Sequence, residues 1–111
     1  MSKTKIDNVD HDDRELYSGF IRLHILHHAS EERIFGLGMA GELARHGYRI
    51  SPGTLYPLLH GLERKGYLQS SDKKIGKTTR REYYATPLGR KALKRAKLKL
   101  NELFGELIEG K

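Results

Sequence analysis

A stretch between residues 51 and 66 carries one apolar stripe at the spacing of an α-helix. Its leucines recur at i, i+3, i+4 and i+7, and they are Leu55, Leu58, Leu59 and Leu62. Ser51 can cap this helix with its hydroxyl, and Pro52 suits the first helical position because its missing N–H would be unpaired there. Gly66 favours the left-handed conformation that ends a helix. The pattern predicts a helix whose apolar stripe is buried.

The opposite face of the same predicted helix is polar. At about 100° per residue it carries Gly53, Pro57, His60 and Arg64, with Thr54, Tyr56 and Gly61 on its flanks. These residues supply hydrogen-bonding groups, one cation and no carboxylate. Pro57 removes a helical hydrogen bond, so it is expected to bend the first turns. An uncovered face of this kind is typical of a helix that reads nucleic acid.

Two further helices are predicted upstream. The first runs from residue 12 or 13 to about residue 29, with apolar side chains around much of its circumference. After a turn at residues 30–33, a shorter helix covers residues 37–46 and ends at Gly47. Its inner face consists of Met39, Ala40, Leu43 and Ala44. Because only residues 47–50 separate this helix from the next, the pair is predicted to form a helix-turn-helix.

The pattern downstream of Gly66 changes from helical to alternating. Residues 67–71 and 80–85 are predicted as two strands of a hairpin, and residues 72–79 as its cationic loop. Thr86 and Pro87 then repeat the arrangement of a hydroxyl cap followed by proline, which predicts a final helix to about residue 109. One face of this helix has the 3,4 spacing of a coiled-coil seam: Leu93, Ala96, Leu100, Leu103 and Leu107, widened by Phe104 and Ile108.

These elements predict a fold that is mainly α with a small β-hairpin, a winged helix-turn-helix followed by a C-terminal dimerisation helix. We divide the chain into a mobile N-terminal tail (1–11), a DNA-binding domain (12–86) and a dimerisation helix (87–111). The final helix has more apolar surface than one small domain can cover, so the first helix is expected to complete a homodimer interface. The predicted interface residues are Leu16, Phe20, Leu23, Leu93, Ala96, Leu100, Leu103, Phe104 and Leu107.

Charge is distributed unevenly along the 111 residues, whose net charge is +7. Residues 1–32 hold seven acids and four bases, whereas residues 63–99 hold thirteen bases and three acids. The basic half is suited to a polyanion, and DNA or RNA is favoured over a membrane because no strongly apolar face accompanies the cations. The chain has no cysteine, no apolar run long enough to span a membrane and no signal-peptide pattern, so a cytoplasmic protein is expected.

Residues 50–68 resemble the signature of PadR-type transcriptional regulators. In that family, Ser-Pro-Gly-Thr-Leu-Tyr-Pro-Leu-Leu begins the recognition helix and Leu-Glu-Arg-Lys-Gly-Tyr-Leu leads into the wing; here these are residues 51–59 and 62–68. Residues 80–89 are similar to the family's second wing strand and the start of its final helix, and the single final helix resembles the short branch. The resemblance implies a dimeric DNA-binding repressor with no enzymatic activity. In some members a small aromatic or cationic effector relieves repression.

On this interpretation the helix at residues 51–65 enters the major groove and the hairpin holds the DNA backbone or the adjacent minor groove. The predicted DNA-binding residues are Ser51, Thr54, Tyr56, His60, Arg64, Lys65, Lys73, Lys74, Lys77, Arg80 and Arg81. Neither a catalytic residue nor a cofactor is predicted.

Three alternatives compete with this interpretation. His24 and His28 lie one helical turn apart and could share a metal ion, which would indicate a small metal-binding protein. The sequence shows no evident third ligand, and histidines of the core or dimer interface are the simpler explanation. Residues 36–41 match the Gly-x-Gly-x-x-Gly dinucleotide motif, but the parallel sheet that it requires is not predicted, so tight helix packing is favoured. A winged-helix protein-interaction module without DNA binding is the third alternative.

Overall fold

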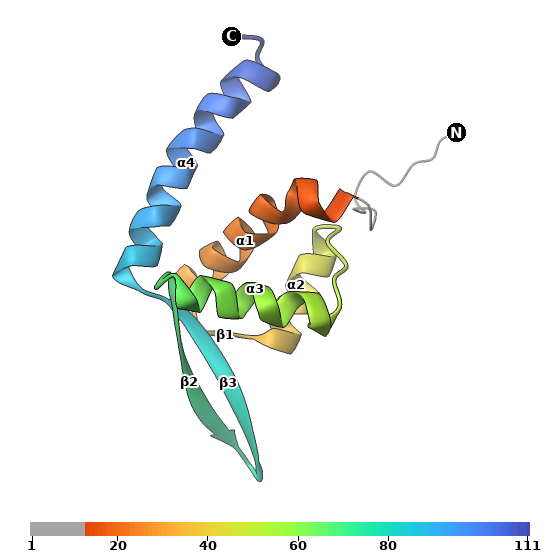
Figure 1. Ribbon diagram of the computed structural model, residues 1–111, viewed down its shortest axis with the longest axis vertical. Helices are drawn as coiled ribbons and strands as arrows, with labels where there is room; N and C mark the ends of the chain where they lie inside the picture. The colour runs from red at the N-terminus through yellow and green to blue at the C-terminus, as the bar shows by residue number, and fades with distance from the viewer. Residues whose placement is uncertain (1–12) are drawn as a thin grey trace, which may run out of the picture.

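The computed structural model describes residues 13–111, which form four helices and a three-stranded antiparallel sheet (Figure 1). In chain order the elements are α1 (Arg14–Glu31), β1 (Ile34–Phe35), α2 (Gly36–Arg45), α3 (Pro52–Arg64), β2 (Leu68–Ile75), β3 (Thr78–Ala85) and α4 (Pro87–Leu107). This order confirms the predicted class, mainly α with a winged helix-turn-helix and a C-terminal helix. The predicted tail at residues 1–11 lies outside the described residues.

The strand β1 is the element that the sequence pattern does not reveal. Ile34 and Phe35 pair antiparallel with Tyr83 and Glu82, which gives the sheet order β1-β3-β2. Two residues are too few to display a period, so no alternation marks them. The turn predicted at residues 30–33 is wrong in its first half, because α1 continues to Glu31.

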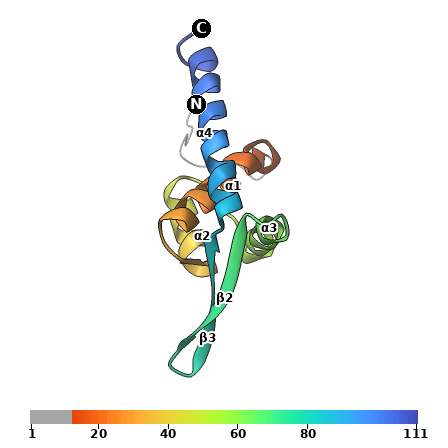
Figure 2. The same ribbon diagram turned by 90° about the vertical axis from the view of Figure 1, so that its left-hand side faces the viewer.

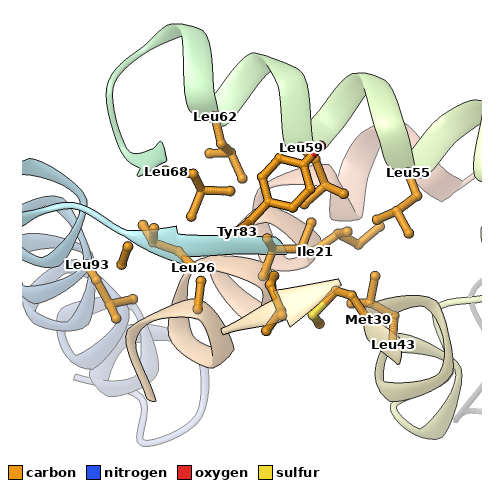
Figure 3. Packing of buried hydrophobic residues seen from close by; sticks show 14 residues of the cluster. Ile21, Leu26, Met39, Leu43, Leu55, Leu59, Leu62, Leu68, Tyr83 and Leu93 are labelled. Atoms are coloured by element: carbon orange, nitrogen blue, oxygen red, sulfur yellow. The ribbon is translucent and has the colours of Figure 1, made fainter. Parts of the chain in front are cut away.

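The core lies between α1, α2, α3 and the sheet, and it also includes Leu93 of α4 (Figure 3). Three leucines of the predicted α3 stripe, Leu55, Leu59 and Leu62, are only 1%, 0% and 5% exposed, and the fourth is partly buried, which confirms the stripe. They pack with Ile21 of α1 and Tyr83 of β3, which are each 1% exposed. Burying a side chain of this size contributes about 1.5–3 kcal/mol to stability. This cluster fixes the orientation of α3, so that its polar side faces solvent.

The helix ends are defined by caps and glycines. Thr86 accepts a 3.0 Å hydrogen bond at its hydroxyl from the N–H of Gly89, which confirms the predicted cap of α4. The same prediction for Ser51 is wrong, because its hydroxyl makes no cap hydrogen bond and lies 3.4 Å from the Thr54 hydroxyl instead. Gly47 and Gly66, with φ of 89° and 83°, adopt the predicted left-handed conformation.

The β2–β3 hairpin is longer than predicted and its turn is shorter. The strands run on to Ile75 and from Thr78, so most of residues 72–79, predicted as a loop, are paired strand. Gly76, with φ of 61°, occupies the first central position of the two-residue turn, where type II′ hairpins require glycine. The hairpin extends from one end of the molecule, whereas α4 rises from the other (Figures 1 and 2).

Candidate nucleic-acid interface

The outer face of α3 is open to solvent. Tyr56, His60, Arg64 and Lys65 are exposed, and the rings of Tyr56 and His60 lie 6.4 Å apart between centroids. Ser51 at the start of this face is also exposed, whereas Thr54, its remaining predicted DNA-binding residue, is half-buried. Neither cation forms an ion pair with another residue of the described chain. A helix fixed by its leucines, with an outer face that is polar and carries only positive charge, can lie in a groove of DNA.

Tyr56 of α3 packs against Gly36, the first residue of α2. A Cβ atom added to Gly36 would lie 2.4 Å from the Tyr56 hydroxyl oxygen, so the tyrosine occupies the space that a side chain at residue 36 would need. Gly36 is buried, and Tyr56 keeps 41% of its surface exposed. Within the Gly-x-Gly-x-x-Gly run of residues 36–41, Gly36 therefore allows α2 and α3 to pack closely. The strand that precedes this run belongs to an antiparallel sheet, whereas a dinucleotide site requires a parallel sheet.

Exposed cations gather on the hairpin. Lys73, Lys74 and Lys77 lie on or beside its tip, and none of the three forms an ion pair within residues 13–111. Arg81 is exposed and pairs with Asp72 across the strands at 3.3 Å. These cations supply unneutralised positive charge at the end of the molecule that the hairpin forms, which suits the binding of phosphates.

Arg80 differs from the other predicted DNA-binding residues of the hairpin. Its guanidinium carbon lies 3.8 Å from the centre of the Phe35 ring, and its Nη2 atom is 2.9 Å from the buried Glu82 carboxylate. A buried carboxylate needs such a partner. Arg80 is thus half-buried and holds β1 to β3, a role that the sequence pattern does not predict.

Three contacts fix the hairpin relative to the end of α3 and the loop that follows α1. The Ser70 hydroxyl donates a 2.6 Å hydrogen bond to the Glu63 carboxylate, which joins β2 to the end of α3. Arg33 donates to the Ser71 hydroxyl at 3.3 Å, and its guanidinium lies 4.2 Å from the centre of the Tyr84 ring. The base of the hairpin is therefore fixed beside the end of α3.

An apolar groove of about 510 Å³ lies between α1 and α4. Four of the predicted dimerisation residues line it, Phe20, Leu23, Leu93 and Leu100. The rest of the α4 seam continues beyond the groove in the part of α4 that rises from the body (Figure 1). Most of the predicted interface remains exposed in a single chain: Leu16 (74%), Phe20 (40%), Leu100 (37%), Leu103 (37%), Phe104 (49%) and Leu107 (69%), with Ala96 half-buried. Leu93, at 7% exposed, already belongs to the core.

Three histidines come together where α1 passes the end of α2. His24 and His28 of α1 meet His46, the C-cap residue of α2, and the side chain of Glu42 lies beside them. His46 and Glu42 are not among the residues predicted from the sequence, although their i, i+4 spacing repeats that of the first pair. Burial lowers the pKa of His24, and the neighbouring His46, His28 and His27 lower it further.

Comparison with known proteins identifies the family. Residues 25–95 match the transcriptional regulator PadR-like family. The chain belongs to this family. It is 48% identical over 97 residues to the transcriptional regulator Rv3488 of Mycobacterium tuberculosis, covering 87% of this chain and 91% of that one. It is also similar to a PadR-family regulator from Eggerthella lenta, with a TM-score of 0.74 and 31% identity over 87% of this chain and 88% of that one. A transcriptional regulator from Clostridium thermocellum has a TM-score of 0.72 at 27% identity, covering 86% and 96% of the two chains.

The family assignment confirms the predicted resemblance and settles the broad function. The chain is a PadR-family transcriptional regulator and not an enzyme. Regulators of this family bind DNA. In the described part of the chain, no helix combines the length and the apolar character needed to cross a lipid bilayer.

Proposed function

We propose that the protein is a homodimeric repressor that binds a specific site on double-stranded DNA in the cytoplasm. The observation that carries this proposal is the outer face of α3. Tyr56, His60 and Arg64 are exposed there, and the leucines on the other side of the helix are buried in the core. A rigidly held helix can place side chains against base edges, and arginine and histidine are suited to hydrogen-bond them.

The residues have different roles in this proposal. Thr54, Tyr56, His60 and Arg64 would contact base edges or flanking phosphates in the major groove. Ser51 and Lys65, at the two ends of α3, would contact the backbone. The hairpin would hold phosphates or the adjacent minor groove through Lys73, Lys74, Lys77, Arg81 and the exposed part of Arg80.

A second copy of the chain is the partner that best fits the α1–α4 groove. Leu100 lines the groove, and the exposed seam residues Leu103, Phe104 and Leu107 follow it along α4. This part of α4 rises away from the hairpin (Figure 2). Two α4 helices packed along this seam would leave both α3 faces free. Such a dimer would read a roughly palindromic site with half-sites about 34–36 Å apart. A small aromatic or cationic effector would bind in the part of the groove that the partner leaves unfilled.

A selection from random DNA tests this proposal. The purified chain is mixed with a random-sequence duplex library, and the bound fraction is sequenced. The expected motif is palindromic, and its duplex should bind more tightly than a scrambled one, with an affinity that falls steeply between two salt concentrations. If no motif is enriched and no salt-dependent binding occurs, the protein-interaction module becomes the better interpretation. A reporter carrying the selected site downstream of a promoter should lose expression when the chain is present, which tests repression.

A further inference from the structure

Three histidines face one another between α1 and the end of α2, and the Glu42 carboxylate lies beside two of them. His24 and His28 lie one turn apart on α1, and their imidazole nitrogens and that of His46 all lie within 4.8 Å of one another. Glu42, one turn before His46, brings its Oε2 atom to 3.4 Å from His28 Nε2 and 3.3 Å from His46 Nε2. Two i, i+4 pairs on facing helices are the arrangement by which helix bundles build metal sites.

The spacing is close to that of a coordinated ion. Ligand atoms about 2.0–2.1 Å from a tetrahedral zinc ion are about 3.4 Å from one another. The Glu42 oxygen already stands at this distance from two of the imidazoles. The three nitrogens must move closer, and the rings of His24 and His46, now stacked at 4.5 Å between centroids, must turn. The terminal torsion of histidine has a broad minimum, so this adjustment is small in energy.

Ion pairing alone does not explain the group. A protonated His28 or His46 could pair with Glu42, but His24 forms no ion pair within the described residues. Three adjacent imidazoles repel one another when they are protonated. A divalent cation instead binds all three in the neutral form.

We propose that His24, His28 and His46, with Glu42 as the fourth ligand, bind one divalent transition-metal ion of the zinc class. Three imidazole nitrogens and one carboxylate oxygen suit Zn²⁺, Co²⁺ or Ni²⁺, whereas Ca²⁺ and Mg²⁺ prefer oxygen ligands. His46 is exposed and the other two histidines are half-buried, which leaves the ion a path from solvent. All four ligands belong to one chain, so neither DNA nor a second chain has to supply a ligand, although His24 also lines the α1–α4 groove.

Titration with Co²⁺ tests the site. The chain is prepared without a polyhistidine tag, freed of metal and titrated with Co²⁺ while its visible absorption is recorded. One Co²⁺ per chain should bind with the intense bands of tetrahedral coordination, and an equivalent of Zn²⁺ should abolish them. His24→Ala and His46→Ala should each weaken Co²⁺ binding at least tenfold. His27→Ala is the matched control, because His27 is an exposed neighbour on the same helix outside the group, and it should leave the affinity unchanged.

Thermal unfolding gives an independent measurement. Zn²⁺ should raise the melting temperature of the wild type and of His27→Ala, because the ion joins two helices in the folded state. At the same Zn²⁺ concentration the increase should be smaller for His46→Ala and for Glu42→Gln, which keeps the size of the side chain. Absence of stoichiometric Co²⁺ binding by the wild type would overturn the proposal. Equal affinities in His46→Ala and His27→Ala would overturn it as well.

Discussion

Gly36 and Tyr56 show how close packing at one residue sets the position of a side chain that we propose contacts DNA. The tyrosine hydroxyl and ring edge fill the space beside the first residue of α2, where a Cβ atom would approach the ring carbons to 2.7 and 2.8 Å. Because Tyr56 is 41% exposed, a side chain at residue 36 would push its ring toward solvent rather than into the core. The glycine therefore determines how the tyrosine is presented on the α3 face.

Substituting Gly36 tests this packing. Gly36→Ala should destabilise the fold by about 1–3 kcal/mol, as other overpacked sites do, and should weaken binding to the selected DNA because Tyr56 is displaced. Gly41→Ala is the matched control on the same helix, where a Cβ atom meets nothing within 4 Å. It should stabilise the chain by up to about 1 kcal/mol and leave DNA binding unchanged. Urea unfolding and DNA titration of both variants check the prediction, and equal behaviour of the two would contradict it.

Sequence preference should reside in the outer side chains of α3. Arg64→Ala or His60→Ala should reduce the discrimination between the selected duplex and random DNA, by about 1–3 kcal/mol where the substitution removes a bidentate hydrogen bond to a base. Lys99→Ala, which removes an exposed cation from α4, should leave discrimination unchanged. Competition titrations with both duplexes measure this. If both α3 variants kept full selectivity, DNA shape or other residues would specify the site.

At the scale of elements, the apolar period locates the α3 helix better than it locates the ends of the hairpin strands. The α3 stripe and the proline and glycine at its ends locate that helix correctly, because burial and backbone preference are encoded in neighbouring residues. The sequence also locates the hairpin, but it predicts strands that are too short. Residues 72–75 and 78–79 are exposed on both faces of a two-stranded ribbon, so no apolar alternation marks them.

The candidate sites are predictable from the sequence to different degrees. The outer face of α3 follows from helical geometry once its buried stripe is known. The packing of Arg80 against Phe35 and Glu82 depends on β1, a long-range pairing that local pattern does not contain. The approach of His46 to His24 depends likewise on how α2 packs on α1. Two of the four proposed metal ligands are therefore visible in the sequence, and the other two require the fold.

The hairpin, as an element, should supply affinity without sequence preference. Replacing Lys73, Lys74 and Lys77 together by alanine should weaken binding to the selected and scrambled duplexes alike, because phosphates carry no base information. The plot of log affinity against log salt should flatten by up to about 0.9 for each phosphate that the variant no longer neutralises. Titrations at several salt concentrations measure the slope. A slope equal to that of the wild type would show that these lysines do not contact DNA phosphates.

At the scale of the whole molecule, two surfaces lie at opposite ends. The cationic hairpin extends from one end, and the exposed apolar part of α4 rises from the other, as the two orthogonal views show (Figures 1 and 2). An apolar surface of this extent is expected to be covered by another chain. Because it lies away from the hairpin and the α3 face, covering it would leave both open to DNA.

The final helix should therefore make the dimer. Leu100→Asp or Leu103→Asp would bury an unpaired charge in the seam, so it should split the dimer or unfold the chain. Leu98→Asp is the matched control. Leu98 is 69% exposed and lies between the seam residues Ala96 and Leu100, but it is not part of the 3,4 seam. This change should therefore leave the dimer intact.

Sedimentation at micromolar concentration, with circular dichroism to confirm folding, measures the outcome. The wild type and Leu98→Asp should sediment as dimers, and a folded Leu100→Asp variant as a monomer. Because each subunit supplies one α3 helix, that monomer should lose tight binding to the full palindrome and keep at most weak affinity for a half-site. A monomeric wild type, or a Leu100→Asp variant that remained a fully active dimer, would place the interface on another surface.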